Sequence, residues 1–91
     1  MTEFFTETES NFLQQKGFTI NKAGNYSLES NGKTFTFVIS TKPDGYLVTL
    51  HITYIEYDPD GPTHTFLNTY KVKWNYSEQS LEDFLNKALQ N

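Results

Sequence analysis

The chain has 91 residues and carries 11 acidic against 7 basic side chains, which gives a net charge of −4 at pH 7. A chain of this length builds one hydrophobic core, so we expect a single domain over residues 1–91. The negative charge opposes the phosphate neutralisation that supplies most non-specific affinity for nucleic acids, so direct nucleic-acid binding is not expected. All the basic residues are lysines, which excludes bidentate arginine contacts to phosphates and guanine edges.

The absence of cysteine excludes disulfides, thiolate nucleophiles and cysteine-based metal sites. Residues 1–17 lack the basic and continuous apolar regions of a signal peptide, and no apolar run is long enough to span a bilayer. We therefore expect a cytoplasmic protein without a membrane partner. Only 36% of the residues are hydrophobic, but 16% are aromatic, so large rings are expected to fill the core.

An amphipathic helix is predicted over residues 2–16. Phe4 and Phe5 are followed eight residues later by Phe12 and Leu13, so both pairs fall on one stripe of a helix. Acidic residues in the first turns suit the helix dipole.

Five runs with period-two alternation follow, and turn residues divide them. They predict strands over residues 18–22, 25–30, 33–41, 46–57 and 63–75. The connections are short, which indicates an antiparallel meander of four to five strands. Asn31-Gly32 is typical of a type I′ hairpin turn and would pair Leu28 with Phe35.

The two longer hairpins are less directly specified by their turns. Around Pro43 two registers differ by one residue, and we choose the one that keeps apolar side chains together, because a one-residue slip would exchange the two faces. It pairs Phe35 with Ile52, Phe37 with Leu50 and Ile39 with Val48. The turn at residues 58–62 is then expected to pair Tyr54 with Phe66, Val48 with Val72 and Tyr46 with Trp74.

A second helix is predicted near the C-terminus, with Ser77 as its N-cap and a hydrophobic staple between Tyr76 and Leu81. Its apolar positions recur at helical spacing. The fold class is therefore α+β, with both helices packed on one face of the sheet. That face is expected to carry Tyr26, Leu28, Phe35, Phe37, Ile39, Val48, Leu50, Ile52, Tyr54, Phe66, Tyr70, Val72 and Trp74.

The opposite face is rich in threonine and is expected to face solvent or a partner. Four large apolar side chains interrupt it: Leu47, Ile55, Tyr57 and Leu67. Of these, the last three would form one apolar patch near the end of the longest hairpin. Negative charge is expected at the same hairpin tip, from Glu56, Asp58 and Asp60, and would complement a basic partner. Whether such acidic side chains imitate a nucleic-acid backbone is left open by the sequence.

No residue set predicts catalysis, a metal site or a cofactor. The two histidines, His51 and His64, are expected on opposite faces of the sheet, with His64 beside Glu56, so they would not share a proton or a metal. Asp58-Pro59-Asp60-Gly61 resembles the start of a calcium loop, but its twelfth position is Thr69 instead of glutamate. A rigid turn explains this segment.

We expect a small acidic, non-catalytic protein that binds another protein, one that is basic or itself binds nucleic acids. An inhibitor or immunity-type protein from a phage or other mobile element fits this size and composition. One alternative is a homodimeric structural or adaptor domain that uses the threonine-rich face or an edge strand. A second is a small enzyme or ligand binder based on His51 or His64. A third, single-strand nucleic-acid binding, would need Lys71, Lys73 and Trp74.

Overall fold

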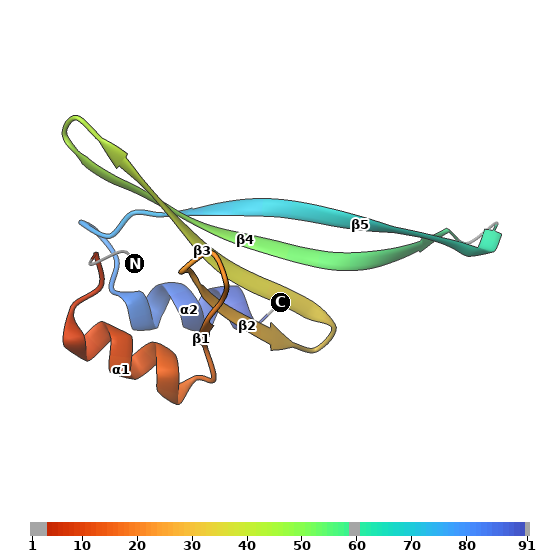
Figure 1. The fold of residues 1–91 in the computed structure, drawn as a ribbon, viewed down its shortest axis with the longest axis horizontal. Coiled ribbons are helices and arrows are strands. Elements are labelled where there is room, and N and C mark those ends of the chain that lie inside the picture. The colour runs from red at the N-terminus through yellow and green to blue at the C-terminus, as the bar shows by residue number, and fades with distance from the viewer. Residues whose placement is uncertain (1–3, 59–60, 91) are drawn as a thin grey trace.

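The computed structural model describes residues 4–58 and 61–90, with side chains outside residues 57–64. Its elements follow one another as α1 (Glu7–Gln15), β1 (Thr19–Ile20), β2 (Tyr26–Ser30), β3 (Lys33–Lys42), β4 (Gly45–Asp58), β5 (Gly61–Trp74) and α2 (Leu81–Leu89). All neighbouring strands are antiparallel, and the sheet order is β1-β2-β3-β4-β5. The predicted α+β meander, with a helix at each end, is confirmed (Figure 1).

The first helix begins later than its apolar spacing predicted. Thr6 is the N-cap: its Oγ1 accepts a hydrogen bond from the Glu9 N–H at 3.1 Å, and its own N–H donates to Glu9 Oε1 at 2.9 Å. This capping box satisfies two amide groups that the start of a helix leaves without partners. Phe4 and Phe5 therefore precede the helix, and their rings pack against Trp74 at centroid distances of 5.9 and 6.3 Å.

The second helix also begins later than predicted, because Ser80 and not Ser77 is its N-cap. Ser80 Oγ accepts a hydrogen bond from the Asp83 N–H at 3.2 Å, whereas Ser77 Oγ donates to Asn75 Oδ1 at 2.9 Å within the preceding turn. With this cap, Tyr76 and Leu81 do not hold the N′ and N4 positions that define the predicted hydrophobic staple. The Tyr76 hydroxyl accepts a hydrogen bond from the backbone N–H of Tyr46 at 3.2 Å.

The first two hairpin registers are confirmed. Asn31 and Gly32 have φ values of 54° and 77°, as a type I′ turn requires, and Leu28 lies opposite Phe35. In the next hairpin Phe35, Phe37 and Ile39 lie opposite Ile52, Leu50 and Val48. Pairing there extends to the residues on either side of Pro43-Asp44, so only these two residues connect β3 and β4.

The last hairpin differs from its predicted register by two residues. Val48 pairs with Trp74, not Val72, and Tyr54 pairs with Asn68, not Phe66. The strand pairing is irregular between Tyr57 and Asp58, so the turn alone does not determine the register of the rest of the hairpin. Because side chains alternate with period two, a shift of two residues keeps each on its predicted face.

Both helices cover the same face of the sheet, and the core lies between this face and the helices (Figure 1). The buried apolar residues are Leu13, Phe18, Phe35, Phe37, Val48, Leu50, Ile52, Trp74, Leu81, Phe84 and Leu85. Along β4 this core ends at Ile52. The cause is length: at about 1.5 Å per residue each nine-residue helix spans ~14 Å, whereas a 14-residue strand spans ~46 Å.

Candidate protein-binding surface

The β4–β5 hairpin extends beyond the rest of the domain. The pairing of β3 with β4 ends at Lys33 and Tyr54, so residues 55–58 of β4 pair only with β5. We call residues 55–58 and 61–67 the arm. Figure 1 shows it as a two-stranded ribbon that projects past both helices.

Large apolar side chains on both faces of the arm are exposed to solvent. On the face away from the helices, Ile55 and Leu67 lie directly opposite each other and are 52% and 70% exposed. On the helix-bearing face, Phe66 is 50% exposed, and Tyr70, three positions beyond the arm, is 40% exposed. We refer to these four side chains as the apolar arm surface.

Two members of this surface are more exposed than their sequence pattern predicted. Phe66 and Tyr70 were expected to be covered by the helices, but they are exposed, and along β4 the buried core ends at Ile52, which pairs with Tyr70. Tyr70 packs edge-on against Tyr54, with ring centroids 5.9 Å apart. Comparing helix length with strand length in the sequence would have found this exposure, because two short helices cannot cover a strand of 14 residues.

The structure separates the predicted binding residues. Leu47 is half-buried and pairs with Ser40 toward the opposite end of the sheet, so it does not join the arm. Glu56 is exposed and accepts a hydrogen bond from the side-chain amide of Asn68. The side chains of Tyr57, Asp58 and Asp60 lie outside the described residues, and their role stays a prediction.

The outer edge of β5 adds main-chain groups to this surface. β5 is the last strand in the sheet order, so within the described part of the chain it pairs on one side only. The segment Thr65-Phe66-Leu67-Asn68-Thr69-Tyr70 contains no charge, glycine or proline. Sheet edges that avoid association are normally protected by such residues, so this segment is open to pairing with another strand.

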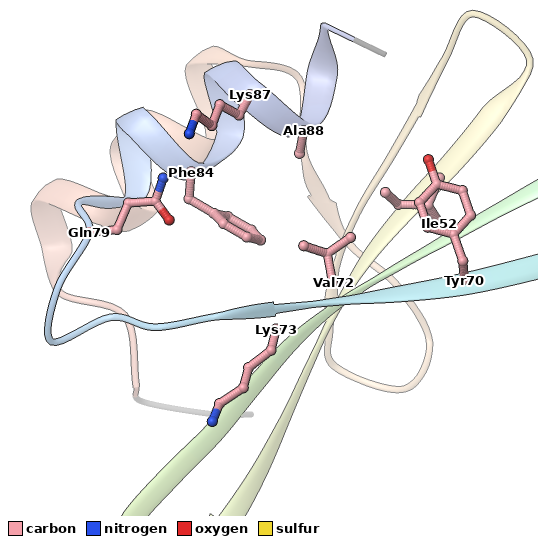
Figure 2. Close-up of a pocket in the computed structure, with 8 residues that line it drawn as sticks. All are labelled: Ile52, Tyr70, Val72, Lys73, Gln79, Phe84, Lys87 and Ala88. Carbon is pink, nitrogen blue, oxygen red and sulfur yellow. The ribbon is translucent and has the colours of Figure 1, made fainter.

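A hollow of about 250 Å³ lies between β5 and α2, next to the root of the arm. Figure 2 shows Val72 and Phe84 facing each other across it, with Tyr70 at one end, whereas the Lys73 side chain points away from the helix. The hollow is lined by Ile52, Tyr70, Val72, Lys73, Gln79, Phe84, Lys87 and Ala88. The lining contains no carboxylate and no histidine, so the hollow suits an apolar side chain better than acid–base chemistry.

The histidines do not form a site. His51 lies on the face away from the helices, between Thr36 and Lys71, and partial burial together with the Lys71 charge lowers its pKa. The predicted pairing of His64 with Glu56 is wrong, because Glu56 lies opposite Phe66. Among the described residues no group of three or more His, Cys, Asp or Glu side chains is arranged to hold a metal ion.

The ring required for the nucleic-acid alternative is not accessible. Trp74 is 2% exposed, and its indole Nε1–H donates to the Gln79 carbonyl at 2.9 Å. Its ring stacks against Phe84 in the core. Trp74 is therefore a core residue and offers no stacking platform for a base.

No protein family, curated protein or solved structure matches the chain. In residues 4–58 and 61–90, neither helix has the length and apolarity needed to cross a membrane.

Proposed function

We propose that this protein is a non-catalytic protein-binding domain and that the arm is its binding element. The supporting observation is the exposure of Ile55, Phe66 and Leu67 on a ribbon that the protein's own helices do not cover. A two-stranded hairpin is marginally stable in water, and exposed apolar side chains that cluster typically mark interaction sites. Both properties favour an arm that is stabilised and covered by a bound partner.

Strand addition is the binding mode that fits this geometry. A partner strand along the outer edge of β5 would form main-chain hydrogen bonds, which supply affinity regardless of sequence. Phe66 and Leu67 point to opposite faces of the ribbon, so a partner that encloses the arm would contact both. This arrangement gives specificity through side chains and affinity through the backbone.

The biological role that we propose is inhibition or immunity: the arm occupies a surface of the partner and thereby blocks it. The net charge of −4 and the exposed carboxylate of Glu56 on the arm favour a basic partner. Origin in a phage or other mobile element is part of this proposal and is supported only by size and composition.

The proposal is tested by comparing capture on three immobilised proteins: wild type, Leu67→Lys and Gln14→Lys. The two variants add the same charge, but Gln14 is exposed on α1, away from the arm. Native bacterial lysate is passed over each, and retained proteins are identified and quantified by mass spectrometry. We expect one stoichiometric protein on wild type and Gln14→Lys that is lost from Leu67→Lys. Equal retention on all three would contradict a binding role for the arm.

A further inference from the structure

We propose that the arm binds a second copy of this chain, in a two-fold dimer in which β5 pairs antiparallel with β5 of the other copy. This inference rests on the proposed function, because the same arm carries the contact: in the absence of the partner, a second copy occupies it. The axis passes through Asn68, so that residues 65–71 of one copy pair with residues 71–65 of the other. The two sheets then join into one continuous sheet.

This register follows from the side chains along the free edge. With Asn68 opposite itself, Phe66 of each copy lies opposite Tyr70 of the other on the helix-bearing face. Leu67 lies opposite Thr69 on the other face. Directly opposed residues share a face of an antiparallel sheet, so both exposed aromatic side chains meet across the new interface. Centring the axis on Leu67 or Thr69 instead would separate these aromatic pairs.

Charge does not oppose the pairing. The segment from Thr65 to Tyr70 is uncharged, and the chosen register places Lys71 opposite Thr65 and not opposite another lysine. Like charges directly opposite each other would destabilise a strand pair. Although each copy carries a net charge of −4, the interface segment itself contributes no repulsion.

The hollow beside α2 supplies an independent reason for a second copy. Tyr70 lines this hollow together with Val72 and Phe84 (Figure 2). In the dimer, Phe66 of the second copy lies directly opposite Tyr70 and diagonally next to Val72, and both of these residues line the hollow. A large apolar ring from the other copy therefore lies beside a depression of about 250 Å³ whose lining includes Val72 and Phe84.

The surface available is close to what a specific dimer requires. The four side chains of the apolar arm surface are 40–70% exposed. Ile55 lies on β4 and takes no part in the β5 pairing; if each of the three side chains on β5 presents on the order of 100 Å², two copies together offer roughly 600 Å² of apolar area. Main-chain groups and the threonines of the paired edges add to this, which brings the interface to the ~1,000 Å² that separates specific from incidental contacts.

Single cysteines provide a direct test, because the wild-type chain contains none. In the proposed register Asn68→Cys lies opposite itself, with Cα atoms about 4.5–5.5 Å apart, which a disulfide can span. A mixture of Thr65→Cys and Lys71→Cys proteins would form a mixed disulfide in the same way, and it leaves Asn68 and its hydrogen bond to Glu56 unchanged. Thr65→Cys alone is the matched control, because its two copies would lie roughly 20 Å apart.

We expect light scattering to give twice the mass of one chain for wild type and Gln14→Lys, and the mass of one chain for Leu67→Lys. Under mild oxidation Asn68→Cys and the mixed pair should crosslink, while Thr65→Cys alone should not. A single-chain mass for wild type at all concentrations up to millimolar would overturn the inference, as would a dimer in which neither crosslink forms. A monomeric wild type whose lysate partner still depends on Leu67 would overturn the second copy alone and leave the proposed function standing.

Discussion

Phe37 and Phe66 lie on the same face of one sheet but in opposite surroundings. Phe37 is 1% exposed and contacts the rings of Phe5, Phe18 and Phe84 at centroid distances of 5.4, 5.7 and 6.2 Å. Phe66 is 50% exposed. The strand sequences around both alternate in the same way, so the difference comes from the reach of the helices. The covered base of the sheet holds the fold together, and the arm is free to bind.

Truncating the two phenylalanines should give the largest contrast. Phe37→Ala removes a ring from the closed core and should lower the free energy of unfolding by about 3–5 kcal/mol. Phe66→Ala should change it by less than about 1 kcal/mol, because half of that ring already contacts water. Chemical denaturation of dilute protein measures both. A similar loss for the two variants would show that the arm contributes to the core.

Amide hydrogen exchange should show the same contrast along a single strand pair. In dilute protein we expect amides at residues 65–67 to exchange at least about tenfold faster than amides at residues 48–52, because local opening of the arm breaks few buried contacts. Raising the protein concentration should slow the exchange of the arm if a second copy covers it. Uniform protection along β4 and β5 in dilute protein would remove the distinction between arm and base.

The helix caps give a smaller effect that separates Ser80 from Ser77. Ser80→Ala removes the hydrogen bond to the Asp83 N–H and should lower the free energy of unfolding by about 1 kcal/mol. Ser77→Ala removes only a contact within the preceding turn and should cost less than half of that. Thermal or chemical denaturation of the two variants decides which serine caps α2.

The pH dependence of His51 should be the smallest effect. Partial burial, and then the Lys71 charge, lower the pKa of His51 from its ordinary value of 6.5, so the unfolded chain binds this proton more readily than the folded chain does. The folded state therefore favours neutral His51. Its contribution to the free energy of unfolding is complete above pH 6.5 and is lost as the pH falls from there through the lowered pKa. His51→Gln should remove this part of the dependence, and Lys71→Gln should reduce it. An NMR titration of His51 above 6.5 would contradict the sign.

The sequence predicted the elements that local chemistry determines. The Asn31-Gly32 turn defined its hairpin because few dipeptides accept two positive φ angles. Around Pro43 the register followed from keeping Phe35 and Phe37 with apolar partners. The assignment of side chains to faces survived even where a register was wrong, because the error was two residues and the period of a strand is also two.

The remaining errors came from competition between local signals and from geometry beyond the strand. Both helices had alternative start residues, and hydrogen bonds to Thr6 and Ser80 decided between them. The exposure of Phe66 depends on where the helices end in space. The alternation of side chains within β5 contains no information about the position of the helices. The apolar patch was placed on one face, whereas Ile55 and Phe66 show that the arm is apolar on both.

The meander order has a consequence for how the chain folds and how it can diverge. Each strand pairs with its neighbour in the chain, so the sheet has low contact order and its hairpins can form early. The costly step is closing the core between distant segments, such as Phe4 and Trp74, whose rings lie 5.9 Å apart. The arm takes no part in that closure. Substitutions at Ile55, Phe66 or Leu67 should therefore leave the folding rate almost unchanged, which allows binding specificity to evolve without slowing folding.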